Sequence, residues 1–237
     1  MSASVLIIIP AYNEEKTITS ILTRLRQEAP DYDRVVVNDG SKDATGKIVT
    51  DLGEKQLSLP CNIGYGHALQ TGLKYGLVQS YDIVVSMDAD GQHQPEDVPR
   101  LVKALQESDA DLVIGSRFCD TGSYNTPINR RLGQIFFSYL TQLLVGQRIY
   151  DTSSGFKALK SQACKVIING NFMDFHLESI VQLSLRKYKI IEVPVVVHER
   201  KFGYSMHSIA SVFHYPIKTI LLTVVAFMDA FVIRRSR

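Results

Sequence analysis

The first half of the chain alternates short apolar runs with amphipathic segments. The apolar runs have the length of buried strands and lie at 5–9, 35–37, 83–87 and 112–114. The segment after the first run carries apolar residues at helical spacing, namely Ile18, Ile21, Leu22 and Leu25. Strands that alternate with helices are typical of parallel sheets with crossover connections. The pattern predicts an α/β fold with a doubly wound, mostly parallel sheet and flanking helices.

The pattern changes after Gly115. A helix predicted over 131–145 carries a wide apolar stripe, for which packing in the core is the simplest interpretation. A second helix is predicted over 177–187, followed by a strand over 190–197. The sequence contains no internal repeat and no low-complexity linker. We therefore expect one catalytic domain over residues 1–205, without a second independent domain.

The C-terminal region is apolar but interrupted by charge. Residues 217–233 contain Lys218 and Asp229, and the chain ends in three arginines within the last four residues. A membrane-spanning helix needs about 20 predominantly apolar residues, and a charge near its centre is costly. Residues 206–237 are therefore predicted to form an amphipathic helix at the membrane interface, with a basic end that binds anionic lipid. A terminal helix buried in a larger assembly is the alternative.

Composition excludes several functional classes. The chain has 237 residues, of which 45% are hydrophobic and 21% charged, so a sizeable core is expected. A net charge of +2 does not favour a nucleic-acid partner. Cys61, Cys119 and Cys164 lack the paired spacing of a zinc site or a disulfide framework. We expect free thiols in a reducing cytosol, and the N-terminus does not have the pattern of a signal peptide.

Polar residues follow three of the predicted strands. They form the turns 10–14, 38–41 and 88–90. In doubly wound sheets, ligands bind outside the carboxyl ends of the strands. The three turns are therefore predicted to meet at one ligand-binding edge.

The third turn contains the pair Asp88 and Asp90. Carboxylates suit Mg²⁺ or Mn²⁺, and Mg²⁺ is usually completed by substrate phosphates. Residues two apart on an extended segment point to opposite sides, so we expect one aspartate to bind the ion directly and the other through water or substrate. The pair therefore indicates a phosphate-bearing substrate. A solvated acidic turn is the alternative interpretation.

Five short motifs occur along the chain. They are Pro10-Ala11-Tyr12-Asn13-Glu14-Glu15, Asn38-Asp39-Gly40-Ser41-Lys42-Asp43, Asn62-Ile63-Gly64-Tyr65-Gly66, Asp88-Ala89-Asp90 and Gly115-Ser116-Arg117-Phe118. Motifs of this kind occur in the same order in family 2 glycosyltransferases of GT-A fold, a Rossmann-like fold, and this sequence resembles that family over most of its length. Three further segments resemble the branch of dolichyl-phosphate mannose synthase and bacterial polyprenyl-phosphate sugar transferases, namely Asp151-Thr152-Ser153-Ser154-Gly155-Phe156, Glu192-Val193-Pro194 and Arg200 with Gly203 and Ser205.

The resemblance implies a donor site for a UDP- or GDP-linked sugar. It places the metal and diphosphate at Asp88, Asp90 and Gln92. It assigns the remaining donor contacts to Pro10, Tyr12, Glu14, Val37, Asp39, Ala89 and Arg200. Asp39 is expected to accept a hydrogen bond from the base. For Tyr12 and Glu14 the alternative is helix initiation, because acidic residues in a first turn favour the helix dipole.

The resemblance also implies a polyprenyl-phosphate acceptor. A phosphate monoester has a second pKa near ~6, so its oxygen is largely anionic at neutral pH and needs no strong base. Arginines suit the task of holding two anionic groups together, and Arg117, Arg131 and Arg200 are the candidates. With Asp90, Arg117 and Arg131 form the expected catalytic set, and Ser154 is a further candidate for the acceptor phosphate.

Two positions depart from the family pattern. Asn38 stands where the family commonly has Asp, although Asp39 remains. Met206 stands where the lipid-phosphate branch usually has Lys. That change removes a cation from the expected phosphate site unless His207 or Lys201 replaces it.

The leading hypothesis is therefore an inverting, metal-dependent hexosyltransferase, peripheral on the inner face of the cytoplasmic membrane. Its expected partners are the nucleotide sugar, the polyprenyl phosphate and the membrane surface, together with a small membrane protein or further copies of itself. One alternative is transfer to a hydroxyl acceptor, which needs a carboxylate base such as Asp151. Another is a noncatalytic binding subunit, which the retained metal-site residues disfavour.

Overall fold

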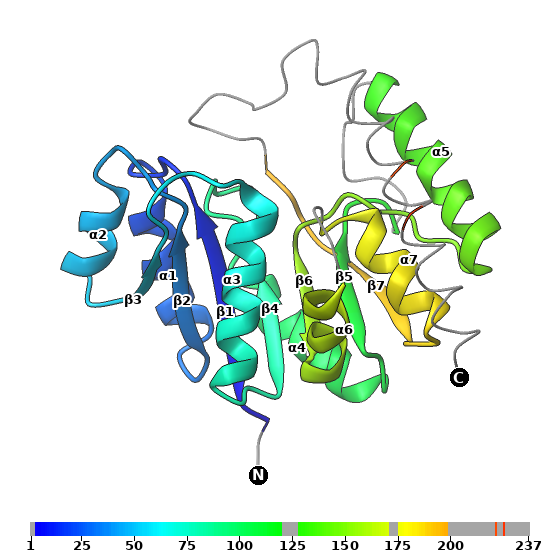
Figure 1. The fold of residues 1–237 in the computed structure, drawn as a ribbon, viewed down its shortest axis with the longest axis horizontal. Coiled ribbons are helices and arrows are strands. Elements are labelled where there is room, and N and C mark those ends of the chain that lie inside the picture. The colour runs from blue at the N-terminus through cyan, green and yellow to red at the C-terminus, as the bar shows by residue number, and fades with distance from the viewer. Residues whose placement is uncertain (1–2, 120–127, 171–174, 199–220, 222–224, 226–237) are drawn as a thin grey trace.

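The computed structural model describes residues 3–119, 128–170 and 175–198, together with Leu221 and Val225. Within this part of the chain one seven-stranded sheet has the order β3-β2-β1-β4-β6-β5-β7 (Figure 1). Its strands are β1 (Val5–Ala11), β2 (Asp33–Asn38), β3 (Lys55–Ser58), β4 (Ile83–Ser86), β5 (Leu112–Ser116), β6 (Lys157–Lys160) and β7 (Ile190–Pro194). β6 pairs antiparallel with β4 and β5, whereas the other neighbours pair in parallel. The predicted α/β fold with a mostly parallel sheet is confirmed.

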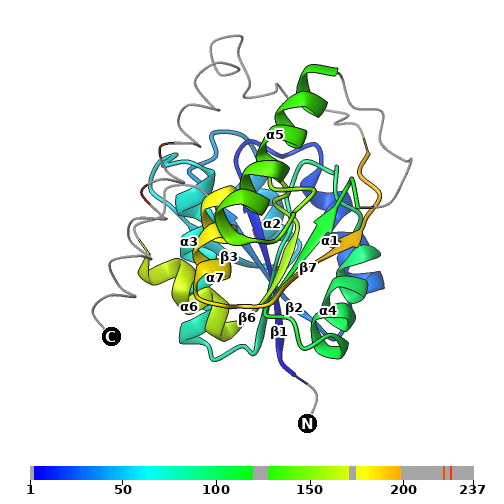
Figure 2. The same ribbon diagram turned by 90° about the vertical axis from the view of Figure 1, so that its right-hand side faces the viewer.

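Helices cover both faces of the sheet. They are α1 (Ile18–Glu28), α2 (Thr45–Asp51), α3 (Tyr65–Val78), α4 (Asp97–Glu107), α5 (Ile128–Val145), α6 (Ser161–Asn169) and α7 (Leu177–Leu185). Helices α1 and α4 lie on one face, and α3, α6 and α7 lie on the other (Figure 2). α5 packs on α7 rather than directly on the sheet.

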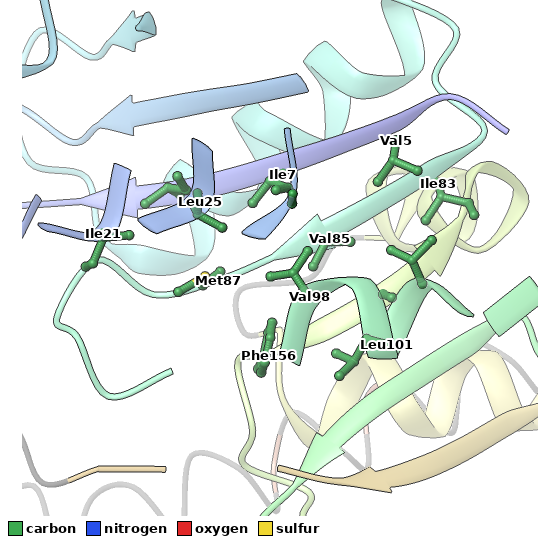
Figure 3. Packing of buried hydrophobic residues seen from close by; sticks show 14 of the residues in the cluster. Val5, Ile7, Ile21, Leu25, Ile83, Val85, Met87, Val98, Leu101 and Phe156 are labelled. Carbon is green, nitrogen blue, oxygen red and sulfur yellow. The ribbon is translucent and has the colours of Figure 1, made fainter. Parts of the chain in front are cut away.

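The central strand β1 is buried on both faces because its side chains alternate between them. Val5 and Ile7 join the core cluster with α1 and α4, and Figure 3 shows this packing. Ile8 joins the cluster with α3 on the opposite face. Gly72 allows that helix to approach closely, since a β-carbon there would collide with the Ile8 side chain. The continuous apolar run of β1 therefore supports two cores.

The structure corrects several predicted boundaries. The helix predicted from Arg131 begins at Ile128, and the helix predicted to Lys187 ends at Leu185. The strand predicted over 190–197 ends at Pro194, because its partner strand β5 ends at Ser116, the residue paired with Pro194. Strand β6 was not predicted at all. The domain boundary between residues 205 and 206 stays a prediction.

The predicted core packing of α5 is wrong for part of its apolar stripe. Ile135, Phe136 and Tyr139 are exposed, and Leu143 exposes 82% of its surface. The opposite side of the helix contributes buried residues such as Ser138 and Thr141. The predicted C-terminal helix lies outside the described residues apart from Leu221 and Val225, which are both helical and exposed.

Candidate active site

Polar turns follow β2, β1 and β4, which are neighbours in the sheet and run in parallel. The Asn13 N–H donates to Ser41 Oγ at 3.0 Å and joins the first two turns. Thr17 Oγ1 donates to the carbonyl oxygen of Ala89 at 2.7 Å and joins the first turn to the third. The structure therefore brings the three predicted turns together at one edge of the sheet.

Glu14 organises the turn after β1. Its N–H donates to Thr45 Oγ1 at 2.8 Å, and its Oε2 accepts a hydrogen bond from Thr17 Oγ1 at 2.9 Å. Helix α1 begins at Ile18, so Glu14 lies before the first helical turn and not within it. The Ile18 N–H nevertheless donates to the Glu14 carbonyl oxygen at 3.0 Å, so Glu14 stands directly before the helix and helix initiation remains an alternative role. Tyr12 is exposed at the same edge, and its predicted contact with the nucleotide stays a prediction.

Asp39 fixes the neighbouring loop that precedes α3. Its two carboxylate oxygens accept hydrogen bonds from the N–H groups of Ile63 and Gly64, both at 2.9 Å. The side chain is only 3% exposed. Gly40 has a φ of +66°, and a β-carbon there would collide with the backbone of Cys61. Asp39 thus has a structural role that the sequence did not reveal, and its predicted contact with the base stays a prediction.

The turn after β4 carries the predicted metal ligands. Oδ1 of Asp88 is buried without a hydrogen-bond partner among the described residues. A β-carbon at Gly155 would lie 3.2 Å from each Asp88 carboxylate oxygen and 2.6 Å from Tyr65 Oη, so glycine is what allows these groups to approach the backbone so closely. Asp90 Oδ1 accepts a hydrogen bond from the Gln92 N–H at 3.0 Å. Asp88 and Asp90 are therefore held within one short turn.

These donors fit a divalent cation that is completed by phosphate. No group of three His, Cys, Asp or Glu side chains with metal-binding geometry occurs in the described ranges. Mg²⁺ is commonly held by one or two carboxylates plus substrate phosphates, so a full protein cage is not required. A buried carboxylate oxygen without a hydrogen-bond partner in the described part of the chain is the kind of donor that such an ion needs. The roles of Asp88, Asp90 and Gln92 as ligands stay predictions.

After β7 the chain returns to the turn that follows β4. The carbonyl oxygen of Gln92 accepts a hydrogen bond from the His198 N–H at 3.0 Å, and Gln92 Nε2 donates to the His198 carbonyl oxygen at 3.2 Å. Arg200 follows two residues later, but it lies outside the described residues, as do Lys201, Met206 and His207. The structure thus fixes the start of the segment that leads to Arg200.

Arg117 forms a bidentate ion pair with Asp151. Arg117 Nε donates to Asp151 Oδ2 and Nη2 donates to Oδ1, both at 2.7 Å, and the Arg117 N–H donates to Oδ2 at 3.0 Å. Arg117 Nη2 also donates to Ser153 Oγ at 2.8 Å. The Asp151 side chain is 0% exposed. Burial acts to raise the pKa of Asp151, but the hydrogen bonds and charge of Arg117 outweigh it and hold the pKa below its usual range.

Glu192 supports this pair from β7. Its carboxylate accepts hydrogen bonds from the N–H groups of Tyr150 and Asp151 at 2.7 and 2.8 Å. Burial raises the pKa of Glu192, and the neighbouring Asp151 charge acts in the same direction. Glu192 therefore anchors the loop that carries Asp151 beneath Arg117.

Other predicted residues have different surroundings. Val37 has no exposed surface and belongs to the core cluster beside α3, and Pro10 is also buried. Ser154 Oγ donates to the Gly115 carbonyl oxygen at 2.7 Å. Arg131 is exposed in the first turn of α5. The structure thus gives Val37 a packing role and Ser154 a hydrogen bond that closes a loop. The binding roles of Pro10, Val37, Arg131 and Ser154 stay predictions.

Two residues of the site were not singled out in the sequence. Thr17 links the first turn to the third, and His93 accepts a hydrogen bond from the Asp88 N–H through Nδ1 at 3.2 Å. The sequence signal for His93 was its position in the same short turn as the two aspartates. Thr17 carries no such signal, because its partner Ala89 is 72 residues away.

Comparisons with known proteins agree with this arrangement. The chain is 35% identical over 214 residues to an undecaprenyl-phosphate mannosyltransferase of Micrococcus luteus, covering 86% of this chain and 87% of that one. It is 32% identical over 211 residues to a UDP-N-acetylglucosamine–dolichyl-phosphate N-acetylglucosaminyltransferase of Methanococcus voltae, covering 80% and 83% of the two chains.

Solved structures share the fold. Glucosyl-3-phosphoglycerate synthase from Mycobacterium tuberculosis, in complex with Mn²⁺, UDP and phosphoglyceric acid, superposes with a TM-score of 0.70 at 20% identity, over 95% of this chain and 79% of that one. The model of the family named Glycosyl transferase family 2 matches residues 6–168. The match spans the three turns and the Arg117–Asp151 pair, and the chain therefore belongs to glycosyltransferase family 2.

Proposed function

We propose that this enzyme transfers a hexose from a nucleotide sugar to a polyprenyl phosphate, with inversion at the anomeric carbon. The observation that carries the proposal is the likeness, over more than four-fifths of the chain, to a relative named for transfer to undecaprenyl phosphate. The second relative is named for transfer from UDP-N-acetylglucosamine to dolichyl phosphate. The two names differ in the sugar and agree on a lipid-phosphate acceptor.

The reaction needs one bond to form as another breaks. A phosphate oxygen of the acceptor attacks the anomeric carbon, and the nucleoside diphosphate leaves with the electron pair of the broken bond. Mg²⁺ or Mn²⁺ at Asp88, Asp90 and Gln92 would act as a Lewis acid that neutralises the departing diphosphate. Arg117, Arg131 and Arg200 would hold the acceptor phosphate near the donor, and Asp151 would keep Arg117 oriented.

Transfer to a hydroxyl acceptor is the alternative, and the geometry of Asp151 disfavours it. A hydroxyl nucleophile requires a base within hydrogen-bond reach of its proton. Both Asp151 oxygens accept hydrogen bonds from Arg117, and the carboxylate is fully buried. Its lowered pKa also makes it a weaker base. An anionic phosphate acceptor requires no such base.

The exposed face of α5 supports a peripheral position at a membrane surface. Phe136, Tyr139 and Leu143 are exposed on this helix, which begins at Ile128 and carries Arg131 in its first turn. The Arg148 guanidinium lies 4.4 Å from the centre of the Tyr139 ring, which adds a cation beside the apolar face. Tyrosine and arginine suit the headgroup region of a bilayer. No helix among the described residues is long and apolar enough to cross a membrane.

Replacing Phe136 and Leu143 together by serine is expected to weaken binding to vesicles that contain anionic lipid. Burial of one large apolar side chain contributes about 1.5–3 kcal/mol, so the loss should reach roughly 10-fold or more. Co-sedimentation with vesicles measures the change. Val78→Ser is the matched control, because Val78 is 77% exposed at the end of α3 on another surface. An equal loss in the control variant, or no loss in the double variant, would contradict the role of α5.

The proposed reaction is tested by release of nucleoside diphosphate. UDP-glucose and GDP-mannose are each supplied with Mg²⁺ or Mn²⁺, with a short polyprenyl phosphate or with the matching polyprenol that lacks phosphate. We expect release with one of the donors to depend on the phosphate-bearing lipid, and the lipid product to have the inverted anomeric configuration. Equal release with the polyprenol would favour a hydroxyl acceptor, and release that ignored both lipids would refute the proposal.

A further inference from the structure

His93 is a buried residue of the turn that follows β4. The residue is 7% exposed, and its ring stacks on Phe156 with ring centres 4.9 Å apart and an angle of 20° between the planes. Phe156 itself is completely buried and begins the segment that enters β6. The imidazole is therefore fixed against the core, although it follows directly after the predicted ligand Gln92.

The imidazole is directed at Asp88. The Asp88 N–H donates to His93 Nδ1 at 3.2 Å, and His93 Nδ1 lies 3.7 Å from Asp88 Oδ2. Nδ1 can accept this hydrogen bond only through its lone pair, which places the ring proton on Nε2. A buried N–H without an acceptor costs about 1–3 kcal/mol. His93 therefore satisfies the backbone of Asp88 and stabilises the turn that follows β4.

Further contacts close the turn between Asp88 and His93. Gly91 has a φ of +79°, which favours glycine, and the Gln92 N–H donates to Asp90 Oδ1 at 3.0 Å. The hydrogen bond from Asp88 to His93 spans this turn and joins its first residue to its last. The positions of Asp88, Asp90 and Gln92 relative to one another therefore depend on His93.

The Asp88 carboxylate is confined from two sides. His93 Nδ1 lies 3.7 Å from its Oδ2, and Gly155 approaches so closely that a β-carbon there would be 3.2 Å from both oxygens. Oδ1 is buried with no hydrogen-bond partner in the described part of the chain. A carboxylate whose backbone is anchored while one of its oxygens stays unsatisfied is preorganised to bind a cation.

We propose that His93 is a positioning residue, whose Nδ1 fixes Asp88 so that the carboxylate is already oriented for the divalent cation that binds with the donor diphosphate. The inference rests on the metal-dependent function proposed above. His93 would not touch the ion or the substrate, and it would act through the Asp88 backbone. Partners that orient metal ligands typically change metal affinity by about 10–100-fold when they are replaced.

Two substitutions separate the effect of the hydrogen bond to Asp88 from the effect of the ring stack on Phe156. His93→Asn keeps an acceptor oxygen near the position of Nδ1 but loses the stack on Phe156. His93→Phe keeps an aromatic ring against Phe156 but loses the acceptor. Calorimetric titration of Mn²⁺ into the protein with UDP measures metal affinity without turnover. Thermal unfolding in EDTA measures the stability of the metal-free protein.

We expect His93→Phe to lower the Mn²⁺ affinity by about 10-fold or more, and His93→Asn to stay within about 3-fold of the wild-type protein. The melting temperature in EDTA should show the reverse order, with the larger loss in His93→Asn. Equal losses of Mn²⁺ affinity in both variants, or none in His93→Phe, would overturn the proposal. The lipid assay tests the acceptor independently of His93. If the wild-type protein binds Mn²⁺ with UDP but does not use polyprenyl phosphate, the proposed acceptor is refuted and the proposed role of His93 still stands.

Discussion

Asp90→Ala is expected to lower the rate of sugar transfer by roughly 10³-fold or more, because Lewis-acid stabilisation of a leaving group contributes several kcal/mol. The substitution removes a carboxylate from the turn after β4, where Asp88 supplies the other. It also removes the acceptor for the Gln92 N–H, so alanine disturbs the turn as well as the charge. Initial rates at saturating donor and acceptor measure the loss.

Asp90→Asn separates these two effects. The amide oxygen can still accept the Gln92 hydrogen bond, whereas the negative charge is absent. We expect Asp90→Asn to lose most of the activity that Asp90→Ala loses, with a melting temperature closer to that of the wild-type protein. Asp109→Asn is the matched control, because its side chain is 96% exposed in a weak ion pair with Lys160 at 3.5 Å. Full activity in Asp90→Asn would show that Asp90 organises the turn and does not bind the cation.

The parallel strands were predictable because they are buried on both faces and appear as continuous apolar runs. Strand β6 was not, although it lies between β4 and β5 in the middle of the sheet. It is four residues long and begins with Lys157, a residue type that is rarely buried. Lys157 is nevertheless fully buried, and its Nζ donates to the Phe175 carbonyl oxygen at 2.5 Å. Its pairing with β4 and β5, which are distant in the sequence, makes this segment a strand that the local pattern did not indicate.

The candidate site, like the sheet, was predictable only in part. Strand order predicts which turns meet, and the structure brings those turns together. Which side chains bind one another inside the site was not predictable, because the partners are far apart in the sequence. Asp39 accepts from Gly64, 25 residues away, and Arg117 donates to Asp151, 34 residues away. A motif identifies the residue type, but only the fold shows which of its atoms are already engaged.

The stripe on α5 was misjudged for a related reason. Periodicity gives the width of an apolar face but does not identify what covers it. One side of α5 packs on α7. Apolar residues that lie outside this contact, such as Phe136 and Leu143, stay exposed. Exposed apolar residues grouped on one helix are informative about a partner surface. The error in the core prediction thus supports the proposed membrane contact.

Asp151→Asn is expected to destabilise the fold by roughly 3–5 kcal/mol, the usual cost of removing one partner from a buried ion pair. The variant leaves the Arg117 guanidinium beside a neutral amide that cannot match its bidentate geometry. Urea unfolding at pH 7 measures the loss. The double variant Asp151→Asn with Arg117→Gln should lose less than the sum of the single changes, because neither charge is then left without its partner.

The destabilisation caused by Asp151→Asn should depend on pH, because the ion pair requires an ionised Asp151. The folded-state pKa of Asp151 lies below its ordinary value, so the pair stabilises the fold above that ordinary value of about 3.9. This contribution is lost as the pH falls through the lowered pKa. The difference in unfolding free energy between the wild-type protein and Asp151→Asn should therefore shrink in acid. A difference that stayed constant down to pH 3 would contradict the ion-pair account.

The activity of Asp151→Asn then distinguishes the two acceptors, provided that transfer is measured at a temperature where the variant is folded. A phosphate acceptor loses no proton to the enzyme, so the substitution should reduce transfer modestly by loosening Arg117, mainly as a higher KM for the acceptor. A hydroxyl acceptor that relied on Asp151 as its base would lose the chemical step, with donor binding unchanged. Arg117→Ala should weaken use of a phosphate acceptor more than Asp151→Asn does, because it removes the guanidinium itself. Collapse of kcat in Asp151→Asn with intact donor binding would therefore overturn the lipid-phosphate proposal.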